Sequence, residues 1–110
     1  MKMKFSNKTV LNFSVQINDK NLLELLVDEY LFFLSRSSVE SLLQEKTVHP
    51  VSRKGGTLLG DEVWLCSREG RLNYWVEQEM THFAFGDNQF RSLLDYLQKS
   101  LGLFLVEIAP

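Results

Sequence analysis

The sequence contains a single cysteine, Cys66, among its 110 residues. One cysteine cannot form a disulfide within the chain, so a disulfide-stabilised secreted scaffold is excluded and a reducing compartment is expected. No apolar run approaches the roughly 20 residues that a membrane-spanning helix needs. The polar residues Asn12, Ser14 and Gln16 interrupt the only stretch that could serve as a signal peptide. We therefore expect a cytoplasmic protein without membrane attachment.

Histidine is also scarce, since only His49 and His82 occur. Zinc sites usually draw three or four ligands from His, Cys and acidic groups, and neither histidine has a partner at ligand spacing, so no metal and no cofactor are predicted. Cys66 and His82 could meet on adjacent strands as a nucleophile pair, which leaves a small hydrolase as an alternative. Because nothing marks an oxyanion hole or an orienting third residue, no catalytic residue is predicted. A buried, inert thiol is the expected state of Cys66.

Positive charge is not in excess, because 12 Lys and Arg stand against 14 Asp and Glu, for a formal charge of −2. Nucleic-acid-binding modules carry a clustered basic excess. Nucleic acid is therefore not the expected partner, although Arg53, Lys54, Arg68 and Arg71 would serve such a role. Divided after residue 55, the N-terminal half has eight basic and six acidic residues, and the C-terminal half has four and eight. A basic protein partner is expected to be attracted to the acidic half.

The chain is rich in large apolar side chains: 45% of residues are hydrophobic, with eight Phe, three Tyr and two Trp. A chain of 110 residues has the commonest size of a single domain. Aromatic side chains bury the most area each, which helps a small domain complete its core. We expect one domain, residues 1–110, that folds without a ligand.

Two regions alternate apolar and polar residues with the period of a strand. The first runs from Thr9 to Ile17. The second begins at Val63 and reaches Val76, with a turn at Arg68-Glu69-Gly70 that predicts a hairpin. A third run, His82 to Phe85, continues the antiparallel order after the polar residues 77–79. The glycine-containing stretch 47–61 is predicted to be a loop.

Three segments carry apolar residues at helical spacing. A helix is predicted from Lys20 to Leu34, with Asn18-Asp19 supplying the N-cap oxygen. Ser38 is predicted to cap a short second helix. Gly86-Asp87-Asn88 precede a third helix, which Gly102 is expected to end. A last strand is predicted over residues 103–108. The fold class is thus α+β, an antiparallel sheet of four to five strands with helices packed on one face, in the order β-α-α-β-β-β-α-β.

Trp64 and Trp75 fall on the same face of the predicted hairpin. If helices cover that face they belong to the core, which is the commoner fate of large aromatics. If helices cover the other face, both tryptophans are exposed beside Glu77 and Glu79. Such a group of side chains is typical of a protein-binding hot spot. The residues predicted to contact a partner are Asp61, Glu62, Trp64, Tyr74, Trp75, Glu77 and Glu79.

The segments Gly60–Trp75 and Phe85–Leu97 resemble the later half of the SUKH immunity proteins. That family pairs an apolar strand, a glycine turn and a strand ending in Tyr-Trp-like aromatics with a capped helix of Phe-x-x-Leu-Leu type. Asp28 to Leu34 is similar to the family's Tyr-x-x-Phe-Leu helix, but the family's preceding Leu-Pro and following Asn-Gly-Gly are missing. The resemblance, over about residues 58–98, implies a bacterial protein that binds and neutralises a toxin domain without doing chemistry.

The sequence therefore predicts a non-enzymatic, protein-binding protein, either a monomer or a weak homodimer. An immunity protein that binds a basic toxin domain is the leading hypothesis. A phage-type inhibitor of a host defence enzyme is an alternative in the same class, and the Cys66/His82 hydrolase is an alternative in another.

Overall fold

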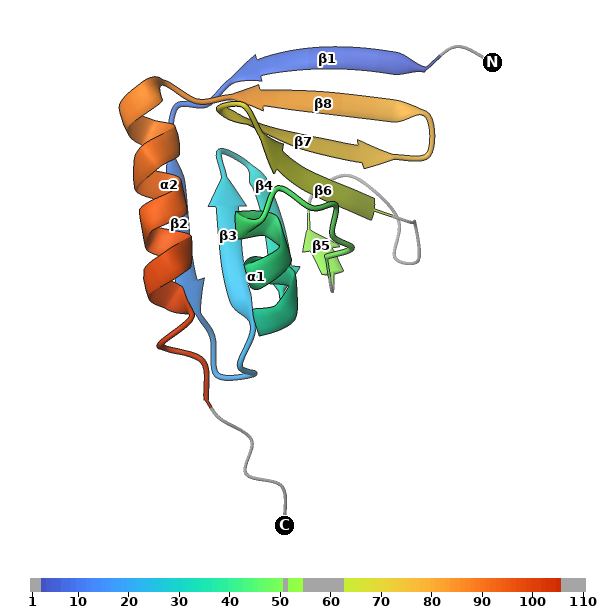
Figure 1. Cartoon of the computed structure of the whole chain (residues 1–110). Coiled ribbons are helices and arrows are strands. Elements are labelled where there is room, and N and C mark those ends of the chain that lie inside the picture. Colours follow the sequence, from blue (N-terminus) through green and yellow to red (C-terminus); the bar gives the residue numbers. More distant parts are fainter. Residues whose placement is uncertain (1–2, 51, 55–62, 106–110) are drawn as a thin grey trace.

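The structure, a computed structural model, describes residues 3–50, 52–54 and 63–105 (Figure 1). Within these ranges the chain forms eight strands and two helices. In chain order they are β1 (Lys4–Thr9), β2 (Phe13–Ile17), β3 (Leu23–Val27), β4 (Tyr30–Leu34), α1 (Arg36–Leu43), β5 (Ser52–Lys54), β6 (Val63–Arg68), β7 (Arg71–Val76), β8 (Glu79–Ala84) and α2 (Asp87–Ser100). The fold is α+β, as predicted.

The strands form two sheets rather than the single sheet predicted. Sheet A has the strand order β1-β8-β7-β6, and sheet B has the order β2-β3-β4-β5. All pairs are antiparallel except β1 with β8, which is parallel. In Figure 1 the strands of sheet A run crosswise to those of sheet B. Helix α1 packs against both β4 of sheet B and β6 of sheet A.

The strand predicted from Thr9 to Ile17 is two strands, one in each sheet. β1 pairs with β8, and β2 pairs with β3. Between them the chain changes sheet at residues 10–12, where the Asp28 carboxylate accepts the backbone N–H of Leu11 at 3.2 Å and of Asn12 at 2.9 Å. These bonds satisfy two backbone N–H groups that lie between the β1–β8 ladder and the β2–β3 ladder. Asp28 thus fixes the junction between the sheets.

The helix predicted over Lys20–Leu34 is wrong, because this segment is the β3–β4 hairpin. The apolar residues of this segment fit both the helical and the strand period, but the buried side chains alternate as in a strand. Leu25 is fully buried, whereas Leu26 is 38% exposed. The aromatic and β-branched residues from Val27 onward also favour a strand. Asp28, with φ of 50°, opens the turn of the hairpin, and the residues that resemble the family's helix form β4.

The predicted cap residue Asn18 does accept backbone N–H groups, but it closes a turn instead of beginning a helix. Its Oδ1 accepts the N–H of Lys20 at 2.9 Å and of Leu22 at 3.1 Å. Asn and Asp favour such turns as strongly as they favour helix caps. Asn18 therefore accepts backbone N–H groups as predicted, but it does so in a turn and not at the N-terminus of a helix.

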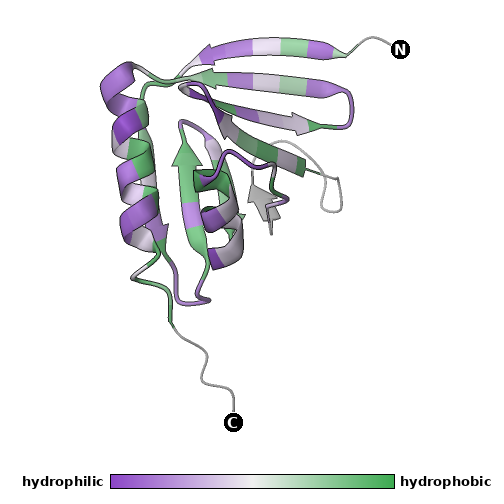
Figure 2. Ribbon diagram, in the orientation of Figure 1, coloured by the Kyte–Doolittle hydropathy of each residue, from purple (hydrophilic) through white to green (hydrophobic). Residues whose placement is uncertain are grey.

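The two later helices were predicted correctly in position. In α1 the cap is Ser35, whose Oγ accepts the N–H of Ser38, so Ser38 is not the cap. α2 begins after Gly86 and buries Leu93 and Leu97, while its visible side in Figure 2 is mostly hydrophilic. α2 packs against β2 and α1.

The strand predicted over residues 103–108 does not form in the described part, residues 103–105. There the side chain of Asn21 bonds the backbone of Leu105 in both directions, donating to its carbonyl at 3.1 Å and accepting its N–H at 2.7 Å. Of the predicted loop 47–61, residues 52–54 form β5, and Val48 bridges to Leu65. The glycines of that loop lie outside the described residues.

The core lies between the inner faces of the two sheets and the helices. Phe32 of β4 contacts Tyr74 of β7 with ring centroids 5.4 Å apart, and Tyr30 contacts Phe83 of β8 at 5.1 Å. The fully buried large side chains, which come from both sheets and both helices, are Phe32, Phe83, Leu23, Leu25, Leu34, Leu42, Leu65, Leu72, Leu93, Leu97, Val27 and Val39. With this core on one side, the other face of sheet A is left without a helix.

Candidate protein-binding face

Strands β6, β7 and β8 form a meander whose turns set the register of sheet A. Arg68 pairs with Arg71, so the β6–β7 turn consists of Glu69 and Gly70. Both have positive φ, 52° and 77°, as the tight two-residue hairpin turn requires. The hairpin and its turn were predicted correctly. The β7–β8 turn is Glu77-Gln78, and it begins with φ of 52° at Glu77.

This register divides the side chains of sheet A cleanly between two faces, because alternate residues of a strand point in opposite directions. The inner face is buried and contains Leu65, Leu72, Tyr74 and Phe83. The outer face carries the residues between them. It is formed by Trp64, Cys66 and Arg68 from β6, Arg71, Asn73 and Trp75 from β7, Met80, His82 and Ala84 from β8, and Phe5, Asn7 and Thr9 from β1.

One line of paired residues across the outer face is apolar. Trp64 pairs with Trp75, Trp75 with Met80, and Met80 with Phe5, so these four residues cross the whole sheet. We call them the apolar row. Phe5 is 64% exposed, and the other three are half-buried. His49 extends the row beyond β6, with its ring 4.8 Å from that of Trp64. A row of large apolar side chains that stays partly exposed typically marks an interaction site.

The next line of paired residues is polar and consists of Cys66, Asn73, His82 and Asn7. His82 Nδ1 and Asn73 Oδ1 are hydrogen-bonded, and the Phe5 ring stacks on the imidazole at a centroid distance of 6.2 Å. Cys66 and His82 share the face, but β7 lies between their strands and separates them by about 10 Å. Asn73 occupies the position between them, so the pair needed for the hydrolase hypothesis is not brought together.

An arginine pair lies at one end of the outer face, beside the exposed Glu69 of the β6–β7 turn, and an acidic residue lies at the other end. Arg68 and Arg71 are exposed, directly paired and next to the β6–β7 turn. At the opposite end of the strands, Glu77 is exposed in the β7–β8 turn. No ion pair to either arginine is found among the described residues. Like charges placed directly opposite each other are unfavourable in a sheet, and a partner's acidic group would relieve that repulsion.

The predicted partner-binding residues meet different fates. Trp64 and Trp75 lie side by side on the outer face, so the expectation that they belong to the core is wrong. Tyr74 is 4% exposed and on the inner face, so it does not belong with them. Glu79 begins β8 on the inner side of the strand and is exposed. Glu77 is the first residue of the β7–β8 turn and is exposed, whereas Asp61 and Glu62 lie outside the described residues.

Two residues of the apolar row, Phe5 and Met80, and the residue that extends it, His49, were not predicted to contact a partner. Phe5 lies on β1, a strand that no sequence pattern indicates because Lys, Ser and Asn surround its one large apolar residue. Lys4 to Thr9 contain no apolar alternation, because a strand with exposed residues on both faces lacks the apolar period that reveals most strands. Met80 could have been found by extending the predicted third strand toward the turn.

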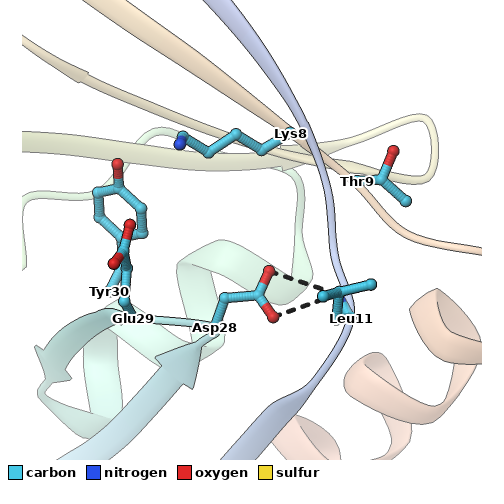
Figure 3. A pocket seen from close by; sticks show the side chains of 6 residues that line it. All are labelled: Lys8, Thr9, Leu11, Asp28, Glu29 and Tyr30. Atoms are coloured by element: carbon cyan, nitrogen blue, oxygen red, sulfur yellow. Dashed lines mark hydrogen bonds between the residues drawn. The ribbon is translucent and has the colours of Figure 1, made fainter.

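An open pocket of about 390 Å³ lies where β1 approaches the β3–β4 turn (Figure 3). It is lined by Lys8, Thr9, Leu11, Asp28, Glu29 and Tyr30. Figure 3 shows the Lys8 side chain reaching toward the Tyr30 ring, and the ammonium lies 5.7 Å from the ring centroid. The pocket lies under the inner side of β1, opposite the face that carries the apolar row.

Within the described ranges, no group of three His, Cys, Asp or Glu residues is arranged to hold a metal ion. Neither α1 nor α2 is long and apolar enough to cross a bilayer. No protein-family model, curated protein or solved structure matches the chain. The resemblance to the SUKH proteins therefore stays a prediction, and functional inference depends on the geometry of this chain.

Proposed function

We propose that this protein acts by binding another protein through the outer face of sheet A. The apolar row carries the proposal, because Trp64, Trp75, Met80 and Phe5 form a continuous strip that neither helix covers in Figure 1. Trp is among the residue types most enriched at binding hot spots. The strip is bordered by polar and charged residues, which is the usual anatomy of an interface.

The charges beside the apolar row describe the expected partner. Glu77 lies at one end of the strands and attracts basic groups, which agrees with the basic partner expected from the acidic C-terminal half. Arg68 and Arg71 lie at the other end and attract acidic groups. A partner that reverses this order of charges would bind in one orientation, because charge complementarity fixes register and speeds association.

The more specific proposal is that the partner is a toxin domain, which this protein neutralises by covering its surface. The sequence resemblance over about residues 58–98 supports this proposal, and the segment includes β6, β7, β8 and most of α2. Inhibition of a host defence enzyme requires the same kind of surface. The identity of the adjacent gene separates the two.

A sheet face with aromatic side chains and arginines can also bind single-stranded nucleic acid by stacking. A protein partner is favoured over nucleic acid because, among the described residues of the outer face, only Arg68 and Arg71 are Lys or Arg, and the chain is acidic overall. Binding of fluorescent oligo-dT or oligo-rU with a steep salt dependence would overturn it.

The proposal is tested by comparing variants in a partner capture from the native host, followed by calorimetry with the purified partner. Trp75→Ala is expected to weaken binding by roughly tenfold or more, because it truncates the middle of the apolar row. Phe33→Ala is the matched control and should leave the affinity unchanged. Phe33 is half-buried and alternates with the buried Phe32 and Leu34, so it points away from the core on sheet B.

Trp75 is half-buried, so its truncation also affects stability. A second variant therefore tests the binding face through a residue that does not contribute to the core. Arg71→Glu changes only an exposed charge and should weaken binding several-fold at low salt and less at high salt. Melting curves identify any unfolded variant. Equal affinity for the wild type, Trp75→Ala and Arg71→Glu would exclude the outer face of sheet A as the binding surface.

A further inference from the structure

β1 is an open edge of sheet A. It is the last strand in the order β1-β8-β7-β6, and no described segment pairs with its other side. All six of its residues, Lys4–Thr9, are exposed. An edge strand of this length offers unpaired backbone groups to any chain that can extend the sheet.

The direction of the free backbone groups follows from the bonds at the two ends of β1. The N–H of Lys4 donates to Gln78 at 2.7 Å, and the N–H of Val10 donates to Ala84 at 2.9 Å. Because backbone groups alternate sides along a strand, the even-numbered residues bond β8 and the odd-numbered ones point away. The N–H and C=O groups of Phe5, Asn7 and Thr9 therefore face the open side.

We propose that the binding partner adds an extended strand to β1, so that sheet A continues into the partner. This inference rests on the proposed protein-binding function and names the element that the partner uses. The side chains of Phe5, Asn7 and Thr9 belong to the outer face, so an added strand would lengthen the apolar row beyond Phe5. A partner strand with an apolar residue opposite Phe5 fits this geometry.

The side chains on the inner side of β1 determine which charge the added partner strand should carry. Lys4 and Lys8 point to this side, and β1 contains no acidic residue. Glu79 lies next to Lys4 but on β8, which is across β1 from the incoming strand, and Glu29 lies with Lys8 in the open pocket. Neither lysine has an ion pair among the described residues. Acidic side chains directly opposite the lysines are therefore favoured.

The same lysines disfavour a second copy of this chain on the edge. In an antiparallel pairing of two β1 strands about Asn7, the lysines of both copies would gather on one side of the seam. Lysines on edge strands are a common protection against such self-pairing. The edge therefore disfavours pairing with a second copy of β1 and favours pairing with an acidic strand. The acidic side chain of that strand beside Lys8 would reach the pocket of about 390 Å³.

The test uses the full chain labelled with ¹⁵N and two synthetic peptides with blocked ends. One peptide alternates glutamate and valine, and the other alternates lysine and valine. The glutamate peptide is expected to shift the amide signals of Phe5, Asn7 and Thr9 and to slow their hydrogen exchange at least about fivefold, since these N–H groups gain partners. The amides of Ser6 and Lys8, which already bond β8, should change less.

Two variants at one position separate backbone pairing from side-chain contact. Asn7→Pro removes an N–H that faces the open side, which an edge strand tolerates, and it should abolish the shifts. Asn7→Ala keeps the N–H and should bind as the wild type does. The Lys4→Glu/Lys8→Glu double variant should reverse the preference in favour of the lysine peptide, and melting curves confirm that each variant is folded.

Equal binding of the two peptides, or no response at the three odd-numbered amides, would overturn the inference. Dimerisation of the peptide-free protein that Asn7→Pro abolishes would also overturn it, because a second copy would then occupy the edge. If Trp75→Ala weakens binding of the protein partner while Asn7→Pro does not, the edge inference fails and the proposed function stands.

Discussion

Asp28 holds the junction between the two sheets through its carboxylate, which accepts the N–H groups of Leu11 and Asn12. Asp28→Ala is expected to lower the free energy of unfolding by about 1–2 kcal/mol, because it removes the acceptor and places an alanine at positive φ. Urea unfolding measures the change.

Asp28→Asn is the matched variant for this prediction. Asparagine keeps an acceptor oxygen and tolerates positive φ, so it should cost less than alanine. Glu29→Ala, in the same turn, should stay within about 0.5 kcal/mol of the wild type. A loss at Glu29→Ala as large as that at Asp28→Ala would show that the carboxylate bonds do not hold the junction.

Individual residues of the face could be predicted only where a strand had been recognised. The parity of positions in the β6–β7 hairpin correctly placed Trp64 and Trp75 on one face, and the same parity should have excluded Tyr74. Phe5 could not be found in this way, because its strand has no buried side. The identity of the covered face depends on where the helices pack, which parity alone does not determine.

The β3–β4 hairpin shows how an element can satisfy two periodicities at once. Leu23, Leu25 and Val27 alternate as a buried strand does, while Leu22, Leu26 and Tyr30 also fit one face of a helix. Helix propensity is a weak prior that tertiary contacts override. The contacts of Phe32 with Tyr74 and of Tyr30 with Phe83 are made across the core and are absent from any local pattern.

A pair of substitutions distinguishes the two structures of this segment. Leu25→Ala is expected to destabilise the protein by about 2–5 kcal/mol, because Leu25 is fully buried in the core. Leu26→Ala should cost less than about 1 kcal/mol, since Leu26 is 38% exposed. Thermal or urea unfolding compares them, and the reverse order would indicate the helix.

The arrangement of the whole chain was less predictable than its parts. The hairpin, the third strand and both later helices are local features, and the sequence indicated each of them. The division into two sheets depends on pairings between distant segments, such as β1 with β8, that no local pattern contains. The parallel pairing of β1 with β8 also brings Phe5 to the row that ends at Trp64, which completes the proposed binding face.

Both tryptophans of the chain, Trp64 and Trp75, lie on this face, so they report directly on whether a partner covers it. The decisive measurement is ¹⁹F NMR of the protein labelled with 5-fluorotryptophan, titrated with the purified partner. We expect both signals to shift and to lose their sensitivity to a soluble paramagnetic agent on binding. A partner that binds by calorimetry while both signals keep their positions and their sensitivity would contradict the proposal that the outer face of sheet A is the binding surface.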